Sequence, residues 1–539
     1  MGQAGRSASR ACLVIATLAA IAAGGCTSVS EYVHNGFKVG PNYAPPQAPV
    51  ARNWIDADDV RVRTQCDDLS KWWVVFKDPV LESLICDAYR QNLSLRVAGC
   101  RVLEARAQML IDVGNLFPQT QTATGSYTRN AISRENANPL APGLKRWYSQ
   151  WNYGFNLSWE LDFWGRLRRA IESDSASLDA SVENYDDVLV TLLGDVATNY
   201  VAYRTAEQRI QYANENVKLQ KITLNIAESR QRFGVQGVTI RDVFQAKSTM
   251  EQTQATIPEL EIARRQAANQ LCILLGIPPQ DLRARLGSGS IPTAPAEVAA
   301  GIPANLLCRR PDVRRAERQA AAQSAQIGIA EAQFYPIISV NGTIGYSAQN
   351  FKDLFREQAL TGSVGPSFTW NILNYGRIRN NVRLQDAHFQ ELVSAYQNTV
   401  LSAAQDVENG LVTFLRANER EKKQKQSVDD EAKAARVAES QYDAGATDVT
   451  TVTLLQQNLV GLEDTLAQAQ GEIATGLIQV YRALGGGWQI RLAPEEGRAL
   501  VPPPAAAQPA ETIPAPAVPE PVAAPVPAPN LKPDRKPLP

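Results

Sequence analysis

Two long stretches without proline constrain the fold of this chain more than any other feature. Residues 164–232 contain no proline and only two glycines, Gly165 and Gly194, and residues 377–441 form a second proline-free run. A helix over the whole first run would be about 100 Å long at 1.5 Å per residue, whereas an ordinary globular helix has about a dozen residues. The length therefore predicts a rod of the coiled-coil type.

Apolar residues recur along the first run at every third or fourth position. The average step is about 3.5 residues, which is the coiled-coil repeat and keeps the apolar side chains on one face. This spacing predicts helix packing and not a cofactor site. The residues of the stripe are Leu178, Val182, Tyr185, Leu189, Leu192, Val196, Tyr200, Tyr203, Ala206, Ile210, Ala213 and Val217.

The second half of the chain repeats the pattern of the first half. The motif that begins at Trp159 matches the one that begins at Trp370, an offset of 211 residues, and Phe233 matches Tyr442, an offset of 209. In each half the long helix ends at a glycine-containing turn, after which a second helix returns over 239–275 or 449–484. We therefore expect two copies of one unit, in residues 76–290 and 300–490.

Short segments typical of strands interrupt the helices in both halves. They lie at about 117–128 and 148–160, and at about 336–347 and 362–371. Residues 151–159 alternate large apolar and small polar side chains without a break. Segments of about nine or ten residues with aromatics on one face fit tilted membrane strands around a water-filled lumen. A soluble, half-buried sheet alternates in the same way and remains the alternative.

Four strands in one chain are too few for a closed barrel. An open sheet edge cannot face lipid, because its backbone N–H and C=O groups would have no partners. If the segments are membrane strands, several chains must share one barrel, and three chains would supply twelve strands. The helices, which are joined directly to the strands, would continue this tube.

The N-terminus has the layout of an export signal. Basic residues Arg6 and Arg10 precede an apolar stretch, and Gly24-Gly25-Cys26 follows it. This order predicts a signal peptide over residues 1–25, cleavage before Cys26 and a covalent lipid such as palmitate on the Cys26 thiol. Ala23 stands where such sites usually carry leucine, so an ordinary signal peptide is the alternative. Residues 26–75 would then form a lipid-anchored, extended leader.

Composition excludes several other classes of protein. The chain has 54 Lys and Arg against 55 Asp and Glu, which argues against nucleic-acid binding. Its only histidines are His34 and His388, so a histidine-rich metal site is not expected. We find no nucleophile–base arrangement and no phosphate loop, and we expect neither an enzyme nor a cofactor. The alanine- and proline-rich residues 496–539 predict a disordered tail.

Five cysteines remain once Cys12 and Cys26 are set aside. Cys86 and Cys100 lie on one predicted helix, about 21 Å apart, which is too far for a disulfide. We expect the cysteines to be small buried hydrophobic residues. The other three are Cys66, Cys272 and Cys308.

Several motifs, taken together and in order, resemble those of the TolC-type outer-membrane efflux proteins, and in particular their lipoprotein branch, the OprM and NodT type. The resemblance covers about residues 26–490. The motifs are Val39-Gly40-Pro41-Asn42-Tyr43, Trp72-Trp73, Trp159-Glu160-Leu161-Asp162, Leu274-Leu275-Gly276, Arg309-Arg310-Pro311-Asp312 and Leu484-Gly485-Gly486-Gly487-Trp488.

The resemblance implies a mainly α fold with transmembrane β-strands. It implies a homotrimer with a shared twelve-stranded outer-membrane β-barrel, continued by a long periplasmic α-helical barrel. The implied function is the passive exit duct of a tripartite efflux pump, with a periplasmic adaptor and an inner-membrane transporter of the RND type as partners. Two alternatives remain open, namely a type I protein-secretion channel and a lipid-anchored coiled-coil scaffold without a pore.

In proteins of this family the periplasmic tip is closed by contacts between helices, often with rings of aspartate. By this resemblance Asp242 and Tyr442 are gate residues, but the matching position in the second half is Thr451, and Thr447 and Leu454 stand where charged residues occur in some members. We therefore expect packing and hydroxyl contacts rather than an acidic ring. A solvated carboxylate near a helix start is the alternative for Asp242. Gly234, Gly237 and Gly445 are predicted to form the tip turns, where an adaptor would dock.

Overall fold

The computed structural model describes residues 28–65, 68–133, 135, 145–234 and 238–492. Cys26, Cys66, Gly237, the predicted signal peptide and the predicted tail at 496–539 lie outside the described residues. The chain divides into two units, Met1–Ile490 and Arg491–Pro539. Every element named below belongs to the first unit.

The two long helices are present and equal in length. Helices α5 (Arg166–Arg232) and α10 (Arg377–Asp443) each have 67 residues, and α6 (Ile240–Leu274) and α11 (Val449–Ala483) each have 35. Equal lengths in both halves support the duplication that the sequence motifs predict. Of the twelve residues in the predicted stripe, the eight from Leu189 to Ala213 are buried and the other four are partly buried.

The single helix predicted to carry Cys86 and Cys100 is in fact two helices, α3 (Pro79–Gln91) and α4 (Leu93–Gly114). The break is at Asn92, whose backbone is extended and whose side chain accepts the N–H of Leu95 at 2.8 Å. Its Nδ2 donates to the carbonyl of Leu274 at 2.9 Å, so a tertiary contact stabilises the cap. The expectation that Cys86 and Cys100 share one helix was therefore wrong.

The expectation for the cysteines holds only in part. The four described cysteines are all free, and Cys272 is buried. Cys86 is partly exposed, whereas Cys100 and Cys308 are exposed, so these last two are not buried hydrophobic residues. Cys100 is exposed because it lies on a solvent-facing side of α4, which buries only Leu95 and Ala98.

The four predicted strands form one antiparallel sheet. They are β2 (Thr120–Ala131), β3 (Trp147–Leu161), β5 (Ile337–Ala348) and β6 (Leu360–Thr369), in the order β2-β3-β5-β6. At 15 residues, β3 is longer than the expected nine or ten. The pairing of Gly154 with Gly345 joins the two halves of the chain at the centre of the sheet. In the described part of the chain, neither β2 nor β6 pairs with a further strand.

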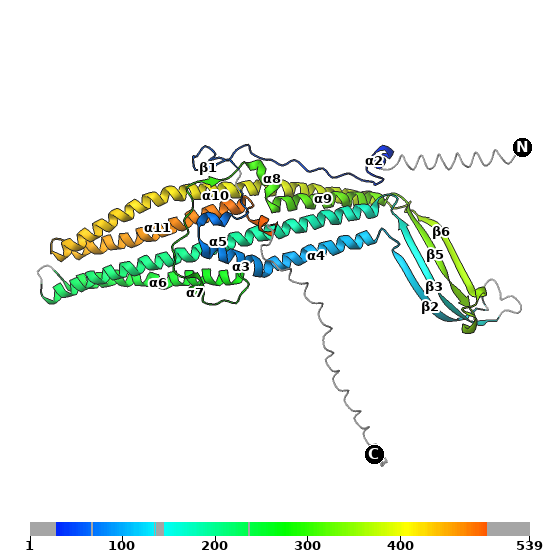
Figure 1. Cartoon of the computed structure of the whole chain (residues 1–539), viewed down its shortest axis with the longest axis horizontal. Helices are drawn as coiled ribbons and strands as arrows, with labels where there is room; N and C mark the ends of the chain where they lie inside the picture. Colours follow the sequence, from blue (N-terminus) through cyan, green and yellow to red (C-terminus); the bar gives the residue numbers. More distant parts are fainter. Residues whose placement is uncertain (1–27, 66–67, 134, 136–144, 235–237, 493–539) are drawn as a thin grey trace, which may run out of the picture. The chain divides into compact units, whose positions relative to one another are not determined.

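The helices next to the sheet follow the same order as the strands. Helix α4 packs on α5, α5 packs on α9 (Pro311–Ala332), and α9 packs on α10. Farther from the sheet, α6 packs on α5, α5 on α11 and α11 on α10. Figure 1 shows the strands at one end of the helices, with the ends of α5 and α10 at the opposite end. Near the sheet, the described chain thus ends with β2 and α4 at one edge and with β6 and α10 at the other.

The main hydrophobic core lies around the middle of α5 and α10, where residues of α3, α6 and α11 pack on them. Trp72 and Trp73, in a short 3-10 helix (Trp72–Phe76), pack with Leu193 of α5, Phe414 of α10 and Leu477 of α11. The leader passes over this region. Its strand β1 (Val62–Arg63) pairs in parallel with β4 (Val298–Ala299), which lies between the two repeats.

The remaining helices are short. They are α2 (Val29–His34), α7 (Arg283–Leu286) and α8 (Leu306–Arg309). No helix in the described ranges combines the length and the hydrophobicity needed to cross a membrane.

Two glycines on α11 allow a direct test of helix packing. A Cβ on Gly476 would lie 2.9 Å from the backbone N of Phe414 on α10, whereas a Cβ on Gly461 would have no neighbour within 4 Å. We expect Gly461→Ala to stabilise the protein by about 0.5–1 kcal/mol through helix propensity. Gly476→Ala should instead lower stability, because the backbones of α10 and α11 would be forced apart.

The measurement is the thermal unfolding midpoint, followed by circular dichroism at 222 nm, for both variants and the parent. Equal stabilisation by the two substitutions would contradict the close approach of α10 and α11.

Candidate functional site

The ends of four helices meet at the end of the bundle far from the sheet. A small apolar cluster, called the tip core below, holds them together. Since the cluster contains residues from all four helices, any separation of the α5–α6 pair from the α10–α11 pair must disrupt it. Its members are Leu224 and Ala227 of α5, Ala246 of α6, Tyr442 and Ala438 of α10, and Val449 and Val452 of α11.

Asp242 caps the start of α6. The N–H of Thr239, the N-cap residue, donates to Asp242 Oδ2 at 2.7 Å. Only 8% of Asp242 is exposed, and Arg241 Nη2 lies 3.6 Å from its Oδ1. A carboxylate in the first turn is favoured by the helix dipole and by the free N–H groups there. Asp242 is therefore a buried capping group, in contrast to the alternative of a solvated carboxylate.

Tyr442 is buried in the tip core and is contacted by an arginine from the other half of the chain. Arg230, in the last turn of α5, donates from Nη1 to the carbonyl of Tyr442 at 2.6 Å. Its Cζ also lies 5.0 Å from the centroid of the Tyr442 ring, a cation–π contact. Burial raises the pKa of Tyr442, the charge of Arg230 opposes this shift, and the charge of Asp242 adds to it. These three residues thus link the two helix pairs.

The glycine turns at the ends of α5 and α10 have the backbone conformation that the sequence predicts. Gly445 has φ of +79°, and the N–H of Ala446 donates to the carbonyl of Gln441 at 2.8 Å, as in a Schellman motif. A Cβ on Gly445 would lie 2.8 Å from Arg230 Nη2, so this glycine also leaves room for the guanidinium. Gly234 has φ of +66° at the end of α5.

The remaining predicted gate residues lie outside the tip core. Thr451 is exposed and hydrogen-bonded to Asp448, Thr447 is partly buried, and Leu454 is exposed. Asp448, which the sequence analysis did not single out, is the N-cap of α11 and accepts the Thr451 N–H at 2.9 Å and its hydroxyl at 2.7 Å. An aspartate directly before Val449, the first apolar residue of α11, is an N-cap signature that the sequence analysis could have used.

Arg230 was also missed, because nothing in the sequence indicates its contact. A basic residue in the last turn of a helix is common and needs no tertiary partner. The partner of Arg230 lies 212 residues away along the chain. Only the packing of α5 beside α10 and α11 brings the two together.

Buried polar side chains join the helix pairs next to the tip core. Gln456 of α11 donates to the hydroxyl of Thr223 on α5 at 2.8 Å, and both residues are buried. Gln245 of α6 donates to the hydroxyl of Thr453 at 3.2 Å. Amide and hydroxyl groups thus supply these contacts between the helix pairs. Each is a neutral hydrogen bond, which contributes about 1 kcal/mol net.

The sheet at the opposite end has one apolar and one polar face. Phe155, Ile344 and Val364 lie on neighbouring strands of the apolar face and are all exposed. On the polar face, Ser158 donates to Asn341 at 2.7 Å and Asn341 donates to Ser367 at 2.7 Å, which links three strands. Apart from Phe351 and Phe355, whose rings pack on Trp151 and Tyr153, the apolar face is open in the chain as described. This is the arrangement expected of strands in contact with lipid.

Comparison with known proteins gives consistent matches along most of the chain. Residues 84–277 and 302–486 match the family model described as outer membrane efflux protein, one segment for each repeat. The chain is 32% identical over 423 residues to the pyoverdine export outer membrane protein OpmQ of Pseudomonas putida, covering 78% of this chain and 88% of that protein. It is 30% identical over 458 residues to nodulation protein T of Rhizobium leguminosarum bv. viciae, covering 84% of this chain and 90% of that protein.

The solved structure of the outer-membrane channel OprN is similar in fold. The TM-score is 0.78 at 30% identity, and the match covers 84% of this chain and 99% of OprN. The family match spans well over half of the chain and falls on both repeats, with the four-stranded sheet and the long helices in the expected places. The chain therefore belongs to the outer membrane efflux protein family.

Proposed function

We propose that this protein is the outer-membrane exit duct of an efflux pump. The observation that carries the proposal is a sheet with an exposed apolar face and two open edges, joined at each strand to a helix of the bundle. The sheet would lie in the membrane and the helices would continue the passage below it. Membership of an efflux family also confirms the prediction that the chain is not an enzyme.

The open sheet edges support assembly as a homotrimer. In lipid, the free N–H and C=O groups of β2 and β6 need partners, and β6 of one chain can supply them to β2 of the next. Three chains would close a barrel of twelve strands, which is wide enough for an open lumen. A scaffold without a pore would leave both edges and the apolar face without a role.

Exposed leucines on the edge helices support the same assembly. Helix α4 runs directly into β2, and α10 follows β6, so pairing β6 with a neighbouring β2 brings α10 of one chain beside α4 of the next. Both helices carry exposed apolar residues at these edges. They are Leu93, Leu103 and Leu110 on α4, and Leu384 and Leu401 on α10.

The other components of the pump are those that the family resemblance implies. The passage itself supplies no energy, so an inner-membrane transporter of the RND type would drive export and select the small-molecule cargo. A periplasmic adaptor would dock at the helix tips, near Gly234 and Gly445. A lipid on Cys26 would attach the leader to the outer membrane. Pyoverdine is named for one relative, but nothing on the described surfaces of this chain favours a particular cargo.

The first test combines planar-bilayer recording with a mass measurement on the same detergent-purified sample. We expect discrete channel events from a trimer. A monomer without conductance would contradict both the shared barrel and the duct.

The tip contacts predict how the passage is gated. Removing the guanidinium in Arg230→Gln should weaken the link between the helix pairs by about 1 kcal/mol or more per chain. Since 1.4 kcal/mol changes an equilibrium tenfold, the open probability in single-channel recordings should rise severalfold. The double variant Asp242→Ala with Tyr442→Ala should raise the conductance as well, because it removes both the capping carboxylate and the buried ring.

Arg232→Gln is the matched control, since Arg232 is exposed in the same helix turn. If Arg232→Gln and Arg230→Gln behave alike, or if closed-state conductance is unchanged in the double variant, the tip contacts described above do not hold the gate.

The cap of α11 predicts a pH effect at the tip. Hydrogen bonds from the Thr451 hydroxyl and N–H hold the pKa of Asp448 below its usual value. The stabilisation of the α11 N-terminus by the Asp448 carboxylate is therefore complete above the ordinary aspartate pKa of about 3.9, and it is lost as the pH falls below that value. We expect hydrogen exchange at residues 450–452, corrected for intrinsic rate, to accelerate in that range. Asp448→Asn, which caps without titrating, should remove this acceleration.

A further inference from the structure

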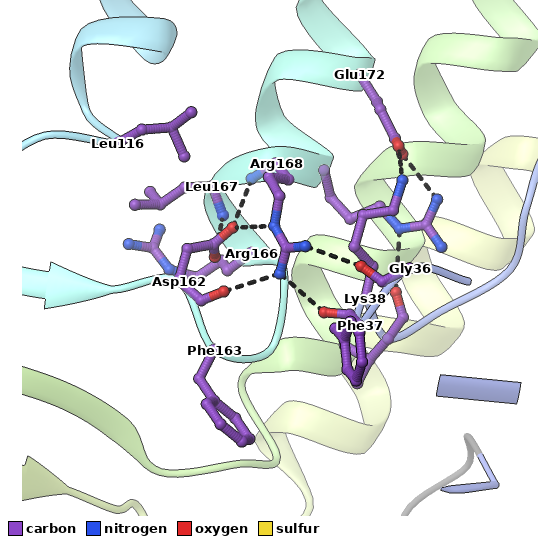
Figure 2. Close-up of polar contacts among 12 residues, drawn as sticks. Gly36, Phe37, Lys38, Leu116, Asp162, Phe163, Arg166, Leu167, Arg168 and Glu172 are labelled. Atoms are coloured by element: carbon purple, nitrogen blue, oxygen red, sulfur yellow. Dashed lines mark hydrogen bonds and ion pairs between the residues drawn. The ribbon is translucent and has the colours of Figure 1, made fainter. Parts of the chain in front are cut away.

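The leader is fixed rigidly where β3 ends and α5 begins. Asp162, just after β3, accepts the N–H groups of Leu167 and Arg168 at 2.8 and 3.0 Å and so caps α5. The Arg168 guanidinium donates to Asp162 and also to the carbonyls of Gly36 and Phe37, at 2.9 and 2.8 Å (Figure 2). One arginine therefore joins the strand end, the helix start and the leader.

A second arginine holds the next part of the leader. Arg169 is buried and donates to the carbonyls of Val39 and Gly40 at 3.1 and 2.8 Å. Gly40 packs so closely on Gly328 of α9 that a Cβ on Gly40 would lie 2.4 Å from the Gly328 Cα. Lys38 forms an ion pair with Glu172. The leader from Gly36 to Gly40 is thus held in one conformation against both repeats.

This rigid support presents an apolar surface outward. Val33 of α2, Phe37 and Phe163 are 53%, 55% and 52% exposed, and they are called the leader patch below. Phe37 has φ of +60°, an unfavourable value for a bulky residue, so its position is imposed by the contacts around it. Tyr32 connects the patch, since its ring packs against Phe37 and Phe163 and its hydroxyl donates to the Phe163 carbonyl at 2.7 Å.

We propose that the leader patch is a membrane-contact surface, seated in the interfacial region of the lipid leaflet that the sheet enters. The inference rests on the proposed function, because it takes the sheet to lie in the membrane. Phe163 follows the last residue of β3 by two positions, so the patch lies at the level where the sheet ends. Aromatic side chains are favoured at this depth of a bilayer.

Two further observations favour lipid as the occupant. Exposed apolar residues occur at other strand–helix junctions too, namely Phe117 before β2 and Ile372 and Tyr375 after β6. In addition, Ser28, the N-cap of α2, is two residues after Cys26. Two residues span at most about 7 Å, so a lipid on Cys26 would enter the bilayer beside α2.

The chemistry of the contact should be apolar rather than electrostatic. The cations next to the patch, Arg168 and Lys38, are already engaged by Asp162, backbone carbonyls and Glu172. Contact should therefore depend little on anionic lipid, unlike the binding of a free basic cluster.

The test places the photo-crosslinking residue benzoylphenylalanine at Val33, Phe37 or Phe163 of the full-length protein, reconstituted in phosphatidylcholine vesicles. Lipid adducts are quantified by mass spectrometry. We expect adduct yields at these positions to exceed that at Ile55 at least severalfold, because Ile55 is 84% exposed but lies farther along the leader. Yields should change less than about twofold when phosphatidylglycerol is added, and should persist in Cys26→Ser.

Benzoylphenylalanine at Phe155, on the apolar face of the sheet, separates the two proposals. Lipid adducts at Phe155 but not at the leader patch would overturn this inference and leave the duct intact, and absence of adducts at both would overturn both. Cross-links from the patch to a second chain would show that a neighbouring protomer covers it, which also overturns the inference. Loss of patch adducts in Cys26→Ser would mean that the lipid alone brings this segment to the membrane, and this result also overturns the inference.

Discussion

Backbone hydrogen bonding at the edges of the four-stranded sheet is the constraint on which the rest of the structure depends. Every strand is joined to a helix, so whatever pairs β2 and β6 also places α4 and α10 beside neighbouring helices. The strand order β2-β3-β5-β6 matches the helix order α4-α5-α9-α10. A single pairing of β6 with a neighbouring β2 would therefore close the layer of strands and the layer of helices together. This is why a chain with no closed barrel of its own can be the repeating unit of one.

The two ends of the bundle are held by different physical interactions. At the tip, the small apolar cluster, the Arg230–Tyr442 contact and the Gln456–Thr223 hydrogen bond join the helix pairs through a few weak contributions. Near the sheet, Arg168 and Arg169 donate to leader carbonyls, among them those of the buried residues Val39 and Gly40. The first arrangement can separate at modest cost, whereas the second resists rearrangement. The proposed duct, if it opens at its tip while remaining fixed in the membrane, would use this difference.

Much of the fold could be predicted because it depends on local periodicity. The long helices, the strands and the duplication were all visible as apolar spacing, proline-free runs and repeated motifs, and the structure confirms them within a few residues. The break at Asn92 was missed because a cap in the middle of a helical pattern is stabilised by the distant carbonyl of Leu274. Of the proposed tip residues, Asp242 and Tyr442 come together, whereas Thr447, Thr451 and Leu454 lie outside the tip core.

The sequence by itself determined the element types, the two-copy organisation and the alternation of the strands, since each of these is set by residues close together in the chain. Only the tertiary structure decided that β3 pairs with β5, that Arg230 reaches Tyr442, and that the leader packs on Arg169. These contacts join residues more than a hundred positions apart, and no local spacing records them. They form because packing the helices of both repeats side by side brings these strands, side chains and carbonyls within contact distance.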